Sequence, residues 1–165
     1  MSFNLDLSKR LVVETQHQKW LPSPAKGVFR KPLEREDKES GHTTSIVKYE
    51  PGSKFSSHNH PMGEEIFVLE GVFSDEFGDY PAGSYLRHPP NSEHAPFSQT
   101  GCIIFVKLNQ FDALDGDIVN INTATTSWRA GIGGLEVMPL HQFSGESVAL
   151  VKWPKGENFQ PHRHH

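Results

Sequence analysis

The sequence predicts an all-β protein, and three observations support this prediction. Short runs rich in β-branched and aromatic residues recur between turn signals formed by Pro, Gly, Asn and Asp. No segment has the periodicity of an amphipathic helix. The 165 residues include 35% hydrophobic residues, 14 Gly, 12 Pro and 11 Phe, which fits a turn-rich β protein rather than a disordered chain. Many short strands at this spacing are typical of a sandwich or a barrel.

Turn signals separate the expected strands. The first run ends at Pro51-Gly52, and the turn Pro61-Met62-Gly63 precedes the next two. Phe77-Gly78-Asp79 and Pro89-Pro90-Asn91 lie on either side of the fourth run, and Thr100-Gly101 precedes the apolar last run. In chain order the expected strands are 44–49, 66–69, 72–74, 85–87, 95–98 and 102–108.

Charge and cysteine content exclude several classes of protein. A formal net charge of −4, without a cluster of Lys or Arg, gives no support for a nucleic-acid partner. No apolar run approaches the ~20 residues that a membrane span needs, and the N-terminus lacks the pattern of a signal peptide. Cys102 is the only cysteine, so an internal disulfide is excluded. We therefore expect a cytoplasmic protein with no membrane partner.

The spacing Gly-x5-His-x-His-x3-Glu-x6-Gly, from Gly52 to Gly71, predicts a metal site. Residues two apart on a strand point to the same face, so His58 and His60 can reach a common centre. The following turn returns Glu64 at the start of the next strand. A fourth candidate, His94, ends the pattern Gly-x5-Pro-x-Asn-x2-His. Three imidazoles and one carboxylate suit zinc, iron, nickel or manganese better than calcium or magnesium.

Other polar residues near these motifs are assigned plainer roles. We interpret His88 as structural or pocket-lining rather than as a ligand. Asp75, Glu76 and Asp79 are expected to form a solvated acidic hairpin. Cys102 precedes an apolar strand and is interpreted as a small core residue, with a reactive thiol as the alternative.

Both metal-site segments resemble the two signature motifs of the cupin superfamily. The first fits without a mismatch, whereas the second departs at Asn91, where cupins usually have Gly, and at Ser98, where they often have Asn. The first of these changes is mild because Asn tolerates the left-handed backbone conformation. The residues at 64–75, 78–83, 89–92, 94–96 and 101–102 further resemble ChrR-like cupins, within a region of roughly residues 12 to 112.

This resemblance implies a double-stranded β-helix, or jelly-roll, barrel with a metal inside it among Phe and Tyr side chains. It implies one divalent ion, zinc first, with iron, manganese or nickel as alternatives. ChrR is an anti-sigma factor that responds to singlet oxygen through a zinc-binding cupin. The His-x3-Cys-x2-Cys motif of its sigma-binding domain is missing here, so a sigma factor is not an expected partner.

Part of the motif recurs about a hundred residues later. Residues 47–60 align with 151–164, and further upstream Gly27-Val28 and Pro32-Leu33 align with Gly134-Leu135 and Pro139-Leu140. Such self-similarity indicates a duplicated domain. We expect residues 1–112 to form a cupin domain with the metal site. Residues 113–165 would be the first strands of an incomplete second cupin that ends just after its His-x-His.

Several explanations of this second repeat stay open. The chain could be a truncated gene product, a fragment or part of a longer polypeptide, and Pro161 to His165 could instead be a tag. His162 and His164 would be two ligands of a second, weak site. The strand expected at 148–153 has an edge with no partner, which favours a homodimer or a higher oligomer.

Two functions compete for the predicted site. The first is a metal-dependent sensor or ligand-binding module in an oxidative or small-molecule response, possible at a closed tetrahedral zinc site. The alternative is a small non-haem metal dioxygenase, similar to acetylacetone-type cupins, acting on a diketone-like or aromatic substrate. An inert structural barrel is the third reading. Whether the protein is an enzyme stays open, because sequence identifies ligands and not the metal.

Overall fold

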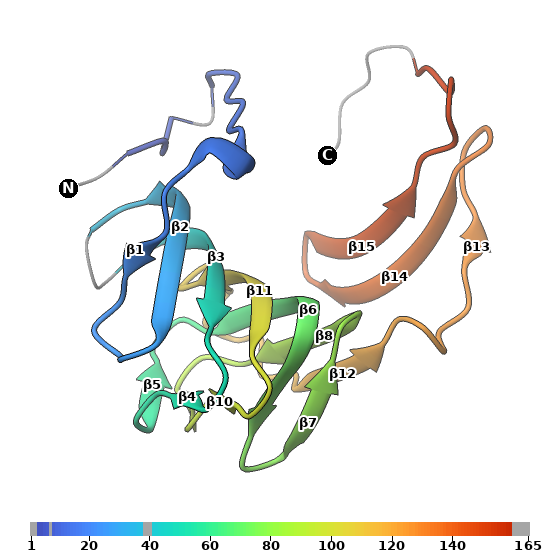
Figure 1. The fold of residues 1–165 in the computed structure, drawn as a ribbon. Coiled ribbons are helices and arrows are strands. Elements are labelled where there is room, and N and C mark those ends of the chain that lie inside the picture. The colour runs from blue at the N-terminus through green and yellow to red at the C-terminus, as the bar shows by residue number, and fades with distance from the viewer. Residues whose placement is uncertain (1–2, 7, 38–40, 160–165) are drawn as a thin grey trace. The chain divides into compact units, whose positions relative to one another are not determined.

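The computed structural model describes residues 3–6, 8–37 and 41–159, and Figure 1 shows the elements that they form. The described helix is a single 3-10 turn, η1 (Thr15–His17). None of the described helices is long and apolar enough to cross a membrane. The strands are β1 (Leu21–Pro22), β2 (Val28–Arg35), β3 (Thr43–Tyr49), β4 (Ser53–Lys54), β5 (His58–His60), β6 (Glu64–Asp75), β7 (Gly78–Pro81), β8 (Ser84–His88), β9 (Ser92–His94), β10 (Phe97–Ser98), β11 (Cys102–Leu108), β12 (Val119–Asn122), β13 (Arg129–Ala130), β14 (Glu136–Phe143) and β15 (Glu146–Lys152).

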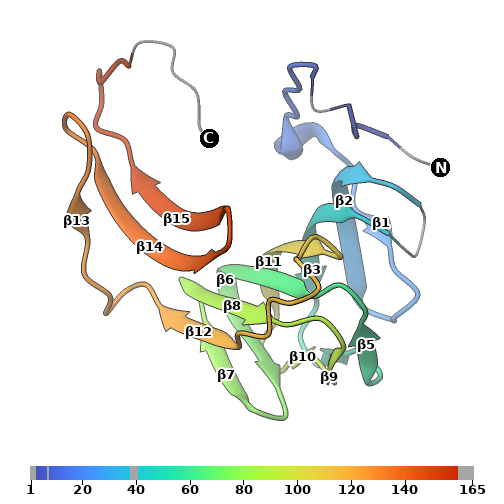
Figure 2. The ribbon, with the colours of Figure 1, turned by 180° about the vertical axis from the view of Figure 1, so that it is seen from behind.

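The chain forms two compact units, Met1–Ala124 and Thr125–His165. The first unit contains a ten-stranded antiparallel sheet in the order β1-β2-β3-β11-β6-β10-β4. In it β7 and β8 also pair with β6, and β12 pairs with β8. Strands β5 and β9 form a separate pair, seen from behind in Figure 2. These strands confirm the all-β prediction and are consistent with a jelly roll, although the described ladders do not close into a ring.

The predicted strands match the observed ones best at the runs 44–49 and 102–108. The expected run 102–108 is β11 without a shift, and 44–49 is β3 less one residue. The runs 66–69 and 72–74 are one long strand, β6, which continues through Gly71. Gly71 has φ +72°, a conformation that its missing side chain allows.

The core of the first unit lies on one face of the central strands. On β11 and in the second half of β3 the buried side chains alternate with more exposed ones, as a strand with one buried face requires, whereas both ends of β6 are buried on both faces. This core consists mainly of Val28, Val47, Tyr49, Ile66, Val68, Phe73, Leu86, Ile104 and Val106. Cys102 is part of it, and burial raises the pKa of its thiol to about 11. A buried, protonated thiol supports the interpretation of Cys102 as a core residue.

The second unit contains the three-stranded sheet β13-β14-β15, and its register repeats that of β1-β2-β3. Arg30 pairs with Val47 in the first unit, and Val137 pairs with Val151 in the second. The first ladder shifts register between Pro32 and Glu34, and the second does so between Pro139 and His141. The aligned residues 32 and 139 are both Pro, so the same sequence feature accompanies the same irregularity.

The turn that follows these strands is also repeated. The amide of Ser53 donates to the carbonyl of Glu50 over 3.0 Å, and that of Glu157 donates to Pro154 over 3.2 Å. The two strand sets differ in burial, because Val47 is 7% exposed and its counterpart Val151 is 48% exposed. The predicted ligands of a second site, at positions 162 and 164, lie outside the described residues.

Candidate metal centre

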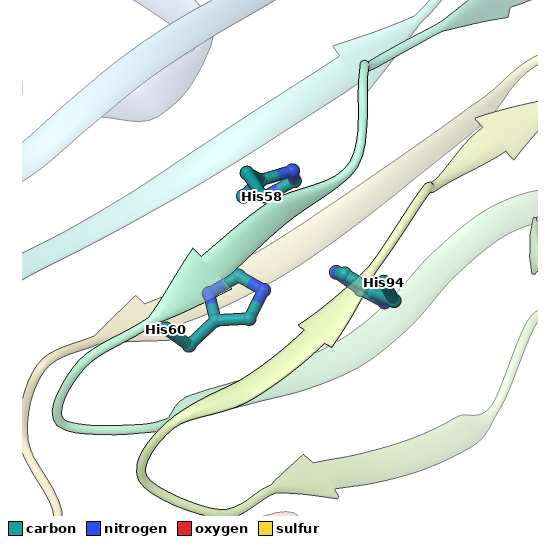
Figure 3. Close-up of side chains that lie close together, drawn as sticks. All are labelled: His58, His60 and His94. Atoms are coloured by element: carbon teal, nitrogen blue, oxygen red, sulfur yellow. The ribbon is translucent and has the colours of Figure 1, made fainter.

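The pairing of β5 with β9 brings three of the predicted ligands together. His58 and His60 lie two residues apart on β5, and His58 pairs directly with His94 of β9. Figure 3 shows the three imidazoles facing one another across these strands. Their ring centroids are 4.8 to 5.4 Å apart. One nitrogen from each ring lies within 4.8 Å of the others, which is close enough for all three to reach one ion.

Glu64, the fourth predicted ligand, begins β6 and reaches the same place. Its Oε2 lies 3.4 Å from Nε2 of His60 and 3.1 Å from Nε2 of His94. The same oxygen is 3.1 Å from Nδ1 of His88, which pairs with Glu64 in the β6–β8 ladder. The structure therefore places His88 beside the predicted ligands. From sequence spacing alone, His88 was interpreted as structural or pocket-lining.

The turn between His60 and Glu64 is fixed by the segment after β11. Asn109 accepts a hydrogen bond from the amide of Met62 over 3.2 Å, and its own amide donates to Gly63 over 2.9 Å. Gly63 has φ +80°, and a Cβ there would collide with the ring of Phe111. That ring lies 3.6 Å below the guanidinium of the fully buried Arg87, so it has little freedom to move. The contacts of Asn109 and Phe111 with this turn therefore fix the position at which Glu64 begins β6.

The expectation that Asp75 is part of a solvated hairpin is wrong. Asp75 is only 5% exposed, whereas Glu76 and Asp79 are exposed as expected. Its Oδ2 lies 3.2 Å from Nδ1 of His94, and its Oδ1 accepts from the amide of Phe77. Asp75 is the last residue of the long strand β6, and the length of this strand brings it next to His94. The two shorter strands predicted at 66–69 and 72–74 did not indicate this contact.

These hydrogen bonds orient two of the imidazoles in the same sense. Nδ1 of His94 faces a carboxylate, and Nδ1 of His58 lies 2.9 Å from the carbonyl oxygen of Ser56. A carbonyl or carboxylate oxygen can only accept, so Nδ1 must carry the proton in each ring. Nε2 is then the nitrogen left to act as a ligand. A second partner of this kind is typical of metal-binding histidines.

The buried charges of the site act strongly on one another. Burial lowers the pKa of His60 to about 4. Burial would also lower the pKa of His94, but its hydrogen bond with Asp75 and its contact with Glu64 raise it to about 9. Burial would raise the pKa of Glu64, and the surrounding histidines instead hold it well below its ordinary value. The site thus keeps a buried carboxylate charged next to several imidazoles.

The residues present fit a divalent metal ion. Nε2 of His60 and Nε2 of His94 are buried and have no hydrogen-bond partner among the described residues. Both lie close to Glu64 without the geometry of a hydrogen bond, although unpaired buried polar atoms are rare in proteins. A cation between these nitrogens and the carboxylate would satisfy them together.

A large cavity opens onto this site within the first unit. Its volume is about 1020 Å³, and His58, His60 and Glu64 form part of its wall. Other parts of the wall are apolar and come from β3 and β11, including Val47, Ile104 and Val106. The space is large enough for a small organic molecule beside the candidate ligands.

The ChrR cupin-like domain is the protein family whose sequence pattern this chain matches. The match covers residues 8–112 and again residues 117–165, which together make up most of the chain. No curated protein gives a significant match.

Solved structures with the same fold share little sequence with this chain. It is similar to a candidate acetylacetone dioxygenase from Methylibium petroleiphilum, with 22% identity, a TM-score of 0.55, and coverage of 70% of this chain and 92% of that one. It is also similar to an acetylacetone dioxygenase from Acinetobacter johnsonii, with 20% identity, a TM-score of 0.55, and coverage of 74% of this chain and 91% of that one. For a candidate dioxygenase from Nostoc punctiforme the identity is 18% and the TM-score 0.62, with coverage of 75% of this chain and 50% of that one. At these identities the likeness establishes the fold alone.

Replacing Gly63 by Ala should destabilise the protein more than the same change at Gly52. Both glycines have positive φ, so each substitution costs about 1–2 kcal/mol for the backbone conformation. A Cβ at Gly52 meets nothing within 4 Å, whereas one at Gly63 meets the Phe111 ring and must displace it. Denaturant unfolding should show an additional loss of about 1–3 kcal/mol for Gly63→Ala. Equal losses would mean that the turn is not held as described.

The metal-free protein should lose stability as the pH rises from about 6.5 to about 9. The pKa of His94 is about 9 in the folded protein and ~6.5 in the unfolded chain. The stabilisation from its contacts with Asp75 and Glu64 is therefore complete below pH ~6.5 and lost above pH about 9. Asp75→Asn should flatten this dependence, and Asp79→Asn, at an exposed position, should not. Melting temperatures measured across this pH range test the expectation. The same slope in Asp75→Asn would contradict it.

Proposed function

The chain belongs to the family of ChrR cupin-like domains, and we propose that its first unit binds one divalent metal ion and presents it to a small organic ligand. The proposed protein ligands are His58, His60, Glu64 and His94. The observation that carries the proposal is the convergence of these side chains at a cavity of about 1020 Å³, whose wall includes His58, His60 and Glu64. Such a combination of ligating groups and accessible space is the usual form of a ligand-binding metal site.

The bound ion would supply positive charge that polarises an oxygen atom of the ligand. The chain's own residues determine how the ion is held. Asp75 and the carbonyl of Ser56 fix the ring orientation of His94 and His58, and the neighbouring histidines keep Glu64 ionised. His88, whose Nδ1 lies 3.1 Å from Glu64, would orient that carboxylate from the side.

A sensor or ligand-binding role is our first proposal for the site. The output would be a change in the metal centre when a small molecule or an oxidant reaches it, with zinc as the first candidate metal. Family membership supports this role.

A metal-dependent dioxygenase is the second candidate, and the cavity favours it. An enzyme needs space for substrate next to the ion, and the cavity reaches three of the four proposed ligands. Elemental analysis of untagged protein separates the two candidates. About one zinc per chain without oxygen uptake favours the sensor. Iron, manganese or nickel, with oxygen consumption on a diketone such as acetylacetone, favours the enzyme.

Removing a proposed ligand should abolish both metal binding and its stabilising effect. In the wild type, saturation at about 100 times the dissociation constant should raise stability by about 2.7 kcal/mol over the metal-free form. His58→Ala and His94→Ala should lose this difference, whereas His17→Ala, at an exposed residue outside the site, should keep it. Metal content and melting temperature are measured on the same samples. Full metal occupancy in both ligand variants would refute the proposed site.

For the second unit we propose the beginning of a second cupin that associates with another copy of the chain. Its three strands repeat the register of β1-β2-β3, yet among the described residues β15 has no strand partner on the edge that corresponds to the β3–β11 ladder. Two β15 strands paired antiparallel about Ala149 would place Glu146 opposite Lys152 twice. Opposite charges across a ladder favour such pairing.

A charge exchange on β15 should control this association. Sedimentation velocity should show a dimer for the wild type and mainly monomer for Glu146→Lys, which places two positive charges opposite each other and leaves the ion pair of Lys152 with Glu136 inside the hairpin unchanged. Adding Lys152→Glu to Glu146→Lys restores opposite charges between the two copies and should restore the dimer. A wild-type monomer at all concentrations, or a double variant that stays monomeric while the single variant dimerises, would rule out this interface.

A further inference from the structure

The repeat inside the chain allows its two strand sets to be compared position by position. Because β13-β14-β15 has the register of β1-β2-β3, each residue of the first set has a counterpart in the second. The comparison shows which side chains the strand arrangement itself requires. Three polar residues that line the cavity have apolar counterparts: Arg30 corresponds to Val137, Ser45 to Ala149 and Tyr49 to Trp153.

The three substitutions lie on one face of the strands, while the opposite face has polar-to-apolar differences of its own, at Lys31 and Met138 and at Thr44 and Val148. Arg30, Ser45 and Tyr49 lie on the same face of β2 and β3 as Val47, and that face borders the cavity. The position of Val47 itself is Val in both strand sets. The same backbone register forms with and without the three polar groups, so the register itself does not require them.

Ser45 gives the clearest sign of a ligand. It is 2% exposed, and its Oγ has no hydrogen-bond partner among the described residues. Leaving a buried hydroxyl unpaired costs stability, typically about as much as a lost hydrogen bond. Ala149 at the equivalent position carries no such group. A ligand oxygen in the cavity would satisfy the Ser45 hydroxyl.

The charges around the cavity indicate the sign of that ligand. Arg30 lies on the cavity wall. Burial and the negative charge of Glu64 raise the pKa of Tyr49, and the positive charge of Arg30 opposes this rise. Lys26 and Lys54 add two exposed cations to the wall, against one exposed carboxylate, Glu36. Away from Glu64 at the metal centre, cationic side chains thus outnumber carboxylates on the wall.

We infer that this cavity selects a small organic anion, whose negative group is bound by Arg30 and whose oxygen atoms accept hydrogen bonds from Ser45 and Tyr49. The apolar part of the anion lies against Val47 and Ile104. This assignment specifies the ligand class of the proposed metal site and rests on it. A carboxylate or an enolate with a short hydrocarbon chain has the required chemistry.

Hexanoate and its neutral isostere hexanamide provide a direct test by calorimetry or ligand-detected NMR on the metal-loaded full chain. The wild type should bind hexanoate at least ~tenfold more tightly, because charge-assisted hydrogen bonds to a guanidinium are the strong ones. Arg30→Gln should remove this preference and leave hexanamide binding unchanged, and Arg30→Lys should restore part of it. Arg129→Gln, the same change at an exposed site on β13, should have no effect.

Ser45→Ala separates ligand binding from folding. It should weaken hexanoate binding several-fold without lowering the melting temperature, because it deletes a hydroxyl that has no partner in the fold. A purely structural Ser45 would give the reverse, a lower melting temperature with unchanged binding.

The two levels of the proposal can fail separately. Equal affinity for both probes, or no binding of either, overturns the anion assignment even if the metal content is one ion per chain. Absence of metal from the wild type overturns the proposed metal site instead. In that case the preference for hexanoate and its loss in Arg30→Gln are measured on the metal-free protein, and they decide the anion assignment there.

Discussion

The antiparallel pairing of β5 with β9 is the constraint on which the candidate site depends. It places His58 opposite His94, residues that are 36 positions apart in the chain. His60 follows on the same face, and the turn after it can then deliver Glu64 to the same point. Asn91, just before β9, has φ +65°, the left-handed conformation expected for a residue that replaces a turn Gly. A one-residue slip in this short pair would turn the imidazoles away from one another.

The electrostatics of the site favour ligand binding over stability. In a low-dielectric interior, charges and unpaired polar atoms are costly unless they are compensated. Here burial lowers the pKa of His60, while Asp75 and Glu64 raise that of His94, so neighbouring rings have opposite preferences for a proton. Two Nε2 atoms have no hydrogen-bond partner among the described residues. One cation at this point would remove both conflicts, which a proton on a single ring cannot do.

Local spacing predicted four residues that the structure brings together, and it did not predict which residues contact them from neighbouring strands. His58 and His60 share a face because of strand geometry, and β11 could be predicted from its apolar run alone. Asp75 and His88 were misjudged or undervalued because their roles depend on pairing between distant strands. Asp75 is brought to His94 by the length of β6, and His88 meets Glu64 through the β6–β8 ladder. Neither the length of β6 nor the register of the β6–β8 ladder can be read from the local sequence.

The repeated strands separate what local sequence determines from what the surrounding fold determines. Both sets form the same ladders, the same irregularity beside a Pro and the same turn at an aligned Gly. Burial does not follow, since Tyr49 is 5% exposed and Trp153 is 56% exposed. Strand β3 has β11 on its second edge, and the described part of the second unit has no equivalent strand. Formation of the hairpin is thus a local property, whereas the cavity and the candidate metal centre of the first unit also require the strands that follow it.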